Sequence, residues 1–366
     1  MAMNRRRLLA GGAALAAAGA GGTYLALRNM GSMAAYDDSV AASRAALTQA
    51  PETAEFVRYA TLAANSHNTQ PWRFRIRAGG IDILPDMTRR LAIVDPDDHH
   101  LFASLGCAAE NLAIASGARG RPGVLGFDPA KDGAVTFTFA SAPDADPAMV
   151  DAIPKRQSTR GDYDGRPVGV ADLRALVDAA AMPGVDVVLI TDRPGIDRIR
   201  DLVVAGNSAQ MADPAFMREL KAWLRFSPAQ AMRTGDGLFG ACSGHPALPV
   251  WLGATMVDLV VTAAAENAKY ARQLASSAGI AVFLARGDDP AHWVQAGLAC
   301  QRFALRATAL GLKTAFVNQP VEVAGLRSEM AGLAGLPGRR PDIVMRFGYG
   351  PALPYSARRP VTAVLA

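Results

Sequence analysis

The spacing of apolar residues predicts a chain in which helices and strands are mixed in irregular order. Apolar residues three and four positions apart indicate helices, whereas alternation of apolar and polar residues indicates strands. The helical pattern covers 41–64, 101–117, 168–180, 196–211, 214–223, 250–266, 292–310 and 321–332. The strand pattern covers 72–78, 81–84, 135–139, 185–190, 280–284, 314–317 and 342–347. Because hairpins interrupt the alternation of strand and helix, we expect an α+β fold rather than a doubly wound parallel sheet.

Two Ala-rich helical segments resemble each other at an offset of 191 residues. The segment 106–114 aligns without a gap with 297–305, and the match continues from 118–120 to 309–311. Five of fifteen positions are identical, a match that two unrelated Ala-rich core helices can also produce. Because the offset is near half of the 366 residues and a predicted strand follows each helix, the pattern favours duplication and fusion.

A polar loop, Ser66-His67-Asn68-Thr69-Gln70-Pro71-Trp72, ends the first predicted helix and leads into a strand. Pro71 disfavours helix at the preceding residue. Ser66, Asn68 and Gln70 alternate, so they can face one ligand together. Uncharged amides and hydroxyls match the mixed donor and acceptor edge of a flavin ring. The same residues also suit a turn that stabilises itself, and the loop alone leaves both interpretations open.

A basic string, Arg156-Gln157-Ser158-Thr159-Arg160, presents two guanidiniums around two hydroxyls. In an extended segment Arg156, Ser158 and Arg160 point to one side and can converge on one anion. This donor set suits a phosphate monoester, although an isolated string of this kind is more often an exposed basic turn. A second cationic cluster near the C-terminus, Tyr355-Ser356-Ala357-Arg358-Arg359-Pro360, can complete a phosphate pocket.

Composition and charge exclude several classes of protein. Hydrophobic residues make up 50% of the sequence, which is typical of a well-buried globular protein rather than a disordered one. The net charge of +5 is unevenly spread: four basic residues and no acid lie in the first 34 positions, so the remainder carries about +1. No block of Lys and Arg interleaved with aromatic residues occurs elsewhere, and we therefore expect no nucleic-acid partner.

The N-terminus has the layout of a targeting signal. Arg5-Arg6-Arg7 precedes an apolar run at 8–27 that is rich in Ala and Gly, which is typical of twin-arginine export. The alternative is a single membrane-spanning helix, because the run has about the minimum length for one. We assign residues 1–34 to the signal, with a cleaved and an anchored form both open. The expected location is the periplasm or cell envelope, and the only membrane contact expected is through this segment.

Neither the cysteines nor the histidines predict a metal site. Cys107, Cys242 and Cys300 show no disulfide framework and no metal-binding spacing. The run Asp95-Pro96-Asp97-Asp98-His99-His100 has the residue types of a metal site, but adjacent histidines rarely converge on one ion. Since a helix is predicted to start here, the acids of this run are expected to cap it.

Taken together, the polar loop and the basic string resemble the two FMN-binding signatures of the nitroreductase superfamily. The segment 311–316 resembles the helix-to-strand passage beside the flavin, and Gly348-Tyr349 with Arg358-Arg359-Pro360 resembles the C-terminal tail. In ordinary members the basic string comes first, and each FMN lies between two subunits. Here the first half has only the amide loop, and the second half has only the basic string and tail. This order is similar to the Acg-type branch, in which two halves are fused into an internal pseudo-dimer.

The resemblance implies a nitroreductase-like α+β fold in two halves, 35–150 and 151–366, that acts as a monomer. It also implies an FMN site. The residues that the motif match assigns to the phosphate are Arg156, Ser158, Arg160, Arg358 and Arg359. Those assigned to the ribityl chain and ring are Ser66, Asn68, Gln70 and Phe316. No side chain is assigned as catalytic acid or base, because hydride transfer through the flavin needs none in its first step.

The function that the resemblance implies is a flavin-dependent oxidoreductase that passes two electrons as hydride to a small acceptor, such as a nitroaromatic or a quinone. The electron donor stays open, because NAD(P)H is scarce outside the cytoplasm. The alternative is a non-enzymatic FMN-binding protein, a store or redox sensor whose flavin is covered. The Gly-, Ser- and Pro-rich segment 226–248 is long for a loop in a compact domain and is a candidate lid.

One copy of each signature predicts one complete cofactor site per chain. We expect purified holoprotein to contain one FMN per polypeptide, measured by flavin absorbance after denaturation against protein concentration. A ratio near two would contradict the fused-dimer interpretation, because the second site would then also be intact.

Overall fold

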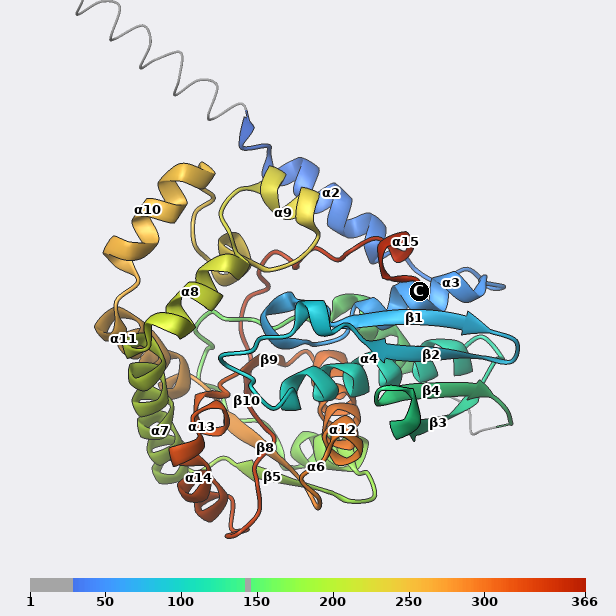
Figure 1. Ribbon diagram of the computed structural model, residues 1–366. Helices are drawn as coiled ribbons and strands as arrows, with labels where there is room; N and C mark the ends of the chain where they lie inside the picture. Colours follow the sequence, from blue (N-terminus) through green and yellow to red (C-terminus); the bar gives the residue numbers. More distant parts are fainter. Residues whose placement is uncertain (1–28, 142–145) are drawn as a thin grey trace, which may run out of the picture.

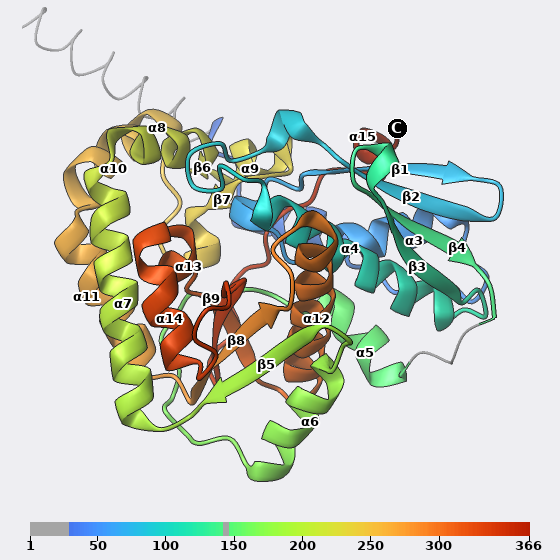
Figure 2. The same ribbon diagram turned by 60° about the horizontal axis from the view of Figure 1, so that its bottom comes forward.

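The computed structural model describes residues 29–141 and 146–366, so most of the expected export signal lies outside it. Two long central helices, α4 (His99–Gly117) and α12 (Pro290–Ala309), have a four-stranded sheet to either side (Figures 1 and 2). Both sheets are antiparallel, which confirms the predicted α+β class. Within the described residues, no helix combines the length and the apolar character needed to cross a bilayer.

The two sheets have the same topology. The first has the order β1 (Trp72–Arg77), β2 (Gly80–Pro85), β4 (Ala134–Phe139) and β3 (Gly123–Asp128). The second has the order β5 (Val185–Ile190), β8 (Gly279–Ala285), β10 (Ile343–Gly348) and β9 (Lys313–Phe316). In chain order, a long central helix connects the second strand of each sheet to its third strand. Helix α4 joins β2 to β3, and helix α12 joins β8 to β9. This repeated order supports the proposed duplication, while the boundary at residue 150 stays a prediction.

The remaining helices surround these sheets. In chain order they are α2 (Met33–Ser43), α3 (Thr53–Thr61), α5 (Pro147–Ala152), α6 (Val170–Ala180), α7 (Arg193–Ala212), α8 (Pro214–Trp223), α9 (Pro228–Thr234), α10 (Val250–Val260), α11 (Ala263–Ala275), α13 (Gln319–Glu322), α14 (Arg327–Leu333) and α15 (Val361–Val364). A two-stranded parallel sheet joins β6 (Leu224–Arg225) to β7 (Leu238–Phe239). The first sheet packs one face against α3 and α4, whereas β8 of the second sheet is buried along its whole length.

Two glycines allow α4 and α12 to cross in direct backbone contact. A Cβ atom on Gly106 would lie 2.1 Å from the carbonyl oxygen of Val294, and a Cβ on Gly297 would lie 2.0 Å from that of Ala103. Both distances are far below van der Waals contact, so only glycine fits at either position. The two contacts are related by the offset of 191, as expected where a former two-fold axis passes through a crossing.

Polar side chains repeat this symmetry one turn further along the helices. Glu110 accepts a hydrogen bond from Arg302 Nη1 at 2.9 Å, and Asn111 Oδ1 accepts one from Gln301 Nε2 at 2.7 Å. At the offset of 191 residues, Gln301 corresponds to Glu110 and Arg302 to Asn111. Each bond therefore joins a residue to the counterpart of its neighbour in the chain. The outer bonds match as well, because Asn111 donates to a carbonyl of α3 and Arg302 donates to a carbonyl of α6. The helix repeat seen in the sequence therefore lies on a pseudo-two-fold axis.

Three of the predicted helices are interrupted. The helix expected over 41–64 is two helices, because Pro51 cannot donate a backbone bond and Arg58 caps the end of α2 by donating to Ser43 O and Ala45 O. The helix expected over 250–266 divides where the Thr262 side chain accepts the N–H of Ala265 and starts α11. The helix expected over 321–332 divides into α13 and α14.

Two further differences concern a strand and a loop. The sequence pattern missed β3, which contains Gly123 and Gly126 and therefore lacks clear alternation. The predicted loop 226–248 contains α9, and this helix packs on α2 of the first half. The C-terminal tail also crosses between the halves: it leaves β10 and ends beside β1, where Ala366 N donates to Phe74 O at 2.8 Å (Figure 1).

The glycine crossing predicts a large and local cost for one added methyl group. We expect Gly106→Ala or Gly297→Ala to lower the free energy of unfolding by about 1–3 kcal/mol, because a backbone carbonyl of the facing helix blocks the new Cβ. The measurement is the shift in the urea unfolding midpoint.

The matched control is Gly332→Ala in α14, where a Cβ has no neighbour within 4 Å. This substitution should raise the free energy of unfolding by about 0.5–1 kcal/mol, since alanine loses less backbone entropy than glycine. Equal effects at the three positions would contradict a close crossing.

Candidate functional site

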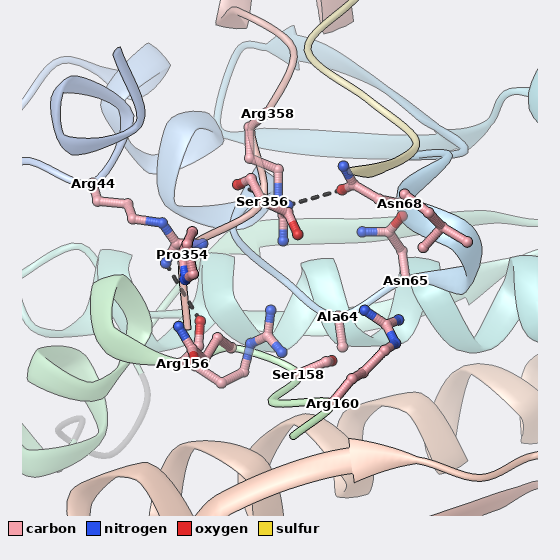
Figure 3. A pocket seen from close by; sticks show the side chains of 12 residues that line it. Arg44, Ala64, Asn65, Asn68, Arg156, Ser158, Arg160, Pro354, Ser356 and Arg358 are labelled. Carbon is pink, nitrogen blue, oxygen red and sulfur yellow. Dashed lines mark hydrogen bonds between the residues drawn. The ribbon is translucent and has the colours of Figure 1, made fainter. Parts of the chain in front are cut away.

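A polar cavity lies where four parts of the chain meet. It encloses a space of about 440 Å³, part of it open to solvent. Its lining comes from the first half, from the segment after α5, from the loop at β7 and from the C-terminal tail (Figure 3). The lining residues are Arg44, Ala64, Asn65, Asn68, Arg156, Gln157, Ser158, Arg160, Leu238, Pro354, Ser356 and Arg358.

Four guanidiniums face this cavity, and no carboxylate is among the described residues that line it. Burial, and then repulsion by Arg156, lowers the pKa of Arg44 to about 10. Burial also lowers the pKa of Arg156, Arg160 and Arg358, in the last case well below its usual value. Buried charges of one sign are costly unless a counter-charge binds between them. The electrostatics of the cavity therefore favour an anion.

Two of these arginines still have unused donors. Arg156 is only 3% exposed, and its Nη2 donates to Leu62 O at 3.0 Å while its Nε has no partner among the described residues. Arg44 donates to Pro154 O at 2.7 Å, and its Nε is likewise unpartnered within the described part of the chain. Buried N–H groups without an acceptor are rare in folded proteins. Arg44 and Arg156 therefore each keep a buried donor that no described group satisfies.

The strand β9 holds the basic string in place. Thr159 N donates to Thr314 O at 2.8 Å, and Ser158 forms an isolated parallel bridge with Thr314. Gln273 of α11 donates to the carbonyl of Arg160. The backbone is thus bonded at the two residues that follow Ser158, and the side chains of Ser158 and Arg160 point toward the cavity, as Figure 3 shows.

The tail completes the opposite wall of the cavity. Arg358 donates through Nε to Thr61 O at 2.7 Å and through Nη1 to Asn68 Oδ1 at 2.8 Å. Asn68 Nδ2 in turn donates to Ala357 O at 3.2 Å and to Gly237 O at 3.1 Å. These bonds tie the polar loop, the tail and the loop at β7 to one another around a single amide.

The polar loop is held in an unusual backbone conformation. His67, Asn68 and Gln70 have positive φ angles of 47°, 54° and 53°, which side chains other than glycine rarely adopt. Asn65 Oδ1 accepts the N–H of Gln70 at 2.9 Å and closes the loop. Local strain of this kind costs of order 1–3 kcal/mol per residue and persists only where surrounding contacts enforce it.

The structure brings five of the nine predicted site residues to the cavity and leaves four outside its lining. Asn68, Arg156, Ser158, Arg160 and Arg358 line it together. Gln70 is fully buried; its Nε2 donates to Gly235 O at 2.8 Å and its Oε1 accepts the N–H of Arg359. The Arg359 guanidinium donates to Ala363 O at 2.6 Å, away from the lining residues.

Ser66 and Phe316 also lie outside the lining. The Ser66 backbone N–H donates to Ser104 Oγ of α4 at 3.4 Å. Phe316 is half-buried and packs against the hydrophobic cores of both halves. Whether either residue contacts a cofactor stays a prediction from the motif.

Sequence reasoning missed several lining residues, chiefly Arg44 and Asn65. The helical pattern over 41–64 predicts that Arg44 lies inside a continuous helix. In the structure it follows the end of α2 and stacks on the ring of Tyr355, with 4.1 Å between the guanidinium carbon and the ring centroid. No local motif marks it, because its partners lie more than 100 residues away. Asn65 adjoins the polar loop, and a wider window on that string would have included it.

An ion-pair cluster fixes the segment 235–237 beside the polar loop. Asp236 accepts from Arg89 on one carboxylate oxygen and from Arg225 Nη2 on the other, the latter at 2.7 Å. Arg89 and Arg225 both lie over the ring of Trp223. Because Gly235 O accepts from Gln70 and Gly237 O accepts from Asn68, the candidate lid segment 226–248 is bonded directly to the polar loop.

The run at the start of α4 acts as a cap. Asp95 accepts the N–H groups of His100 and Leu101 at 3.0 and 2.9 Å, and His99 Nε2 lies 2.8 Å from Asp342 Oδ1. Burial lowers the pKa of His99 to about 4 and raises that of Asp342 to about 7. Candidate ligand atoms of Asp95, His99 and His100 lie within 4.8 Å of one another, but both Asp95 oxygens already bind the helix terminus.

Two related proteins match most of the length of the chain. It is 28% identical over 324 residues to "Putative NAD(P)H nitroreductase Rv3131" of Mycobacterium tuberculosis H37Rv, covering 84% of this chain and 88% of that protein. The protein named "Putative NAD(P)H nitroreductase MT3217" from strain CDC 1551 / Oshkosh matches to the same extent.

Solved structures give a weaker match. The FMN-dependent nitroreductase NfnB of Mycobacterium smegmatis, in complex with NADPH, is 13% identical with a TM-score of 0.37, over 56% of this chain and 87% of that one. A nitroreductase with bound FMN from Desulfitobacterium hafniense is 15% identical with a TM-score of 0.36, over 58% and 94%.

The family comparison covers the second sheet together with the basic string. The profile described as "Nitroreductase family" matches residues 153–350, more than half of the chain. That range begins just before Arg156 and ends just after β10, so it contains every strand of the second sheet and the arginines of the basic string. The chain therefore belongs to the nitroreductase family.

Proposed function

We propose that this protein binds FMN and acts as an oxidoreductase that transfers two electrons between a small donor and a small acceptor. The observation that carries the proposal is the cavity lined by four arginines and no described carboxylate. A dianionic phosphate supplies the missing counter-charge and the acceptors for the unused donors of Arg44 and Arg156. The relatives named NAD(P)H nitroreductase support the same class of reaction.

The residues present fit the phosphate end of FMN. Arg156, Arg160 and Arg358 converge from opposite walls, and Ser158 adds a hydroxyl between the two arginines of its string. When bound, FMN would supply a ring that accepts and releases two electrons as a hydride. The role of the protein is to bind and orient FMN. The guanidiniums would hold the phosphate, and the bonds of Asn68 to Arg358 and Gly237 keep the polar loop in place on the other side of the cavity.

The role of the four predicted residues outside the cavity lining follows from their bonds. Gln70 and Arg359 hold the polar loop to the tail, and Ser66 ties the loop to α4. In this proposal they position the loop rather than contact the phosphate. Phe316 lies between the two cores, at the end of the strand that supports the basic string.

A second candidate function has one specific observation in its favour. The amides of Asn68 and Gln70 bind the carbonyls of 237 and 235, and Asp236 is fixed by two arginines. A loop held this firmly over the polar loop suits a flavin store or sensor with a covered ring. The electron donor also enters this choice, because the proposed export by residues 1–34 places the protein away from cytoplasmic NAD(P)H.

Removal of one cavity charge tests the phosphate assignment. We expect Arg160→Gln to weaken FMN binding by about 10–100-fold, because a hydrogen bond to a charged group contributes about 1.5–3 kcal/mol. Riboflavin, which lacks the phosphate, should bind the variant and the wild type equally. The measurement is flavin fluorescence quenching on titration of apoprotein.

The control for that titration is Arg166→Gln, which removes an exposed arginine paired with Asp164 and should leave both affinities unchanged. If Arg160→Gln weakens riboflavin as much as FMN, the cavity does not bind the phosphate.

A turnover experiment separates the enzyme from the flavin store. For the enzyme, anaerobic NAD(P)H or a quinol should reduce the bound flavin, and a nitroaromatic or quinone should reoxidise it through repeated cycles. Reduction by dithionite alone, without acceptor turnover, would instead indicate a covered flavin.

Asp236→Asn sharpens this result, because it weakens the ion pairs that hold the segment 235–237. If that segment covers the ring, the variant should be reduced faster than wild type. Asp164→Asn breaks an exposed ion pair elsewhere and should not change the rate.

A further inference from the structure

Arg346 is a charged residue in the middle of a buried strand. It lies on β10, between β8 and β9, and its side chain is fully buried. Its neighbours Met345 and Phe347 on one side of the strand, and Val344 on the other, all belong to hydrophobic cores. The guanidinium makes no ion pair with any described carboxylate. Because a buried charge without a counter-charge is costly, its hydrogen bonds must contribute something that an apolar side chain could not.

The hydrogen bonds of Arg346 end on the basic string. Its Nη2 donates to Thr159 O at 3.1 Å and to Gly161 O at 2.7 Å, the carbonyls directly before and after Arg160. Its Nη1 donates to Gln273 O at 3.3 Å, and the side-chain amide of Gln273 donates to Arg160 O. Three consecutive carbonyls, 159 to 161, are therefore bonded either to Arg346 or to the residue that Arg346 bonds.

Tyr163 holds the guanidinium of Arg346 in this position. The guanidinium carbon lies 4.1 Å from the centroid of the tyrosine ring, and the tyrosine hydroxyl donates to Thr159 O at 3.2 Å. A cation over an aromatic face is attracted by the ring, and more strongly where both groups are shielded from water. The segment 159–163 thus folds around Arg346 and is bonded to it at several points.

The side chain of Arg160 has no comparable support. Its guanidinium lines the cavity, and it makes no hydrogen bond or ion pair with any residue that the structure describes (Figure 3). A long side chain without a partner keeps several rotamers open, so its backbone sets the limits within which the charge can lie. The backbone position that Arg346 fixes therefore determines how far Arg160 reaches into the cavity.

We propose that Arg346 is a positioning residue of the cofactor site, which fixes the backbone on both sides of Arg160 and so directs that guanidinium toward the phosphate of FMN. The inference rests on the proposed function, because it takes the anion in the cavity to be this phosphate. Arg346 is not among the residues that line the cavity and acts only through Arg160. The planar fork of arginine suits this task, since one guanidinium reaches carbonyls on both sides of a residue.

A double-mutant cycle on flavin affinity tests this coupling. The full chain is freed of flavin, and the dissociation constants of FMN and riboflavin are measured by fluorescence quenching. We expect Arg346→Met to weaken FMN binding by about 5–10-fold, which is part of the loss expected for Arg160→Gln. Riboflavin binding should not change. In the Arg160→Gln background, Arg346→Met should cause no further loss, because no guanidinium is left to position.

The matched control is Arg339→Met. Arg339 also donates to two backbone carbonyls, those of Leu284 and Ala285, but at the other end of β8. Its substitution should leave both flavin affinities unchanged. The unfolding midpoint of each flavin-free variant shows whether it has folded. If Arg346→Met does not fold, Arg346→Lys replaces it in the cycle, because lysine keeps the charge and lacks the planar fork.

The possible results separate this inference from the proposed function. If the Arg346 substitution weakens FMN binding equally with and without Arg160, or weakens riboflavin as much as FMN, its role is only structural. The inference would then be overturned, while the phosphate assignment would stand. If Arg160→Gln alone leaves FMN affinity unchanged, the phosphate assignment is wrong and the inference is overturned with it.

Discussion

The crossing of α4 and α12 is the contact on which the rest of the structure depends. At Gly106 and Gly297 the backbones of the two helices are in direct contact, so there is no space between them for even one methyl group. From this fixed point Gln301 donates to Asn111 and accepts the backbone N–H of Ala64, a residue that lines the cavity. The helix pair that joins the two halves therefore also fixes the backbone position just before the polar loop. Backbone packing of this kind is rigid, because protein interiors are as dense as organic crystals.

The cavity gathers like charges that water would otherwise solvate. Arg44, Arg156 and Arg358 are directed mainly at backbone carbonyls, which orient the guanidiniums without neutralising them. Carbonyl dipoles reduce the cost of burial but leave a net positive field. An acid in the lining would remove that field and, with it, the attraction for an anion. The fold thus places unneutralised charge where four chain segments converge.

The sequence predicted the parts of this protein whose information is local. Helix α12, the hairpin β1–β2 and the repeat at offset 191 all carry continuous patterns, and the structure has them. The position of Arg44 was not predictable, because its orientation depends on Pro154 and Arg156 in the other half. The bonds of Gln70 were equally hidden, since its acceptor belongs to Gly235 and its donor to Arg359. Motifs identified residue types for the site, while long-range bonds decided which of them reach the cavity.

The course of the C-terminal tail has a consequence for the order of folding. Arg358 donates to the carbonyls of Thr61 and Ala63, and Ala366 N donates to Phe74 O, so the tail bonds to residues almost 300 positions away in the sequence. Contacts between such distant residues carry a loop-closure cost that local contacts do not, and they therefore form slowly. The anion-binding cavity is thus expected to close after both sheets have formed, and ligand capture then depends on docking of the tail between the two halves.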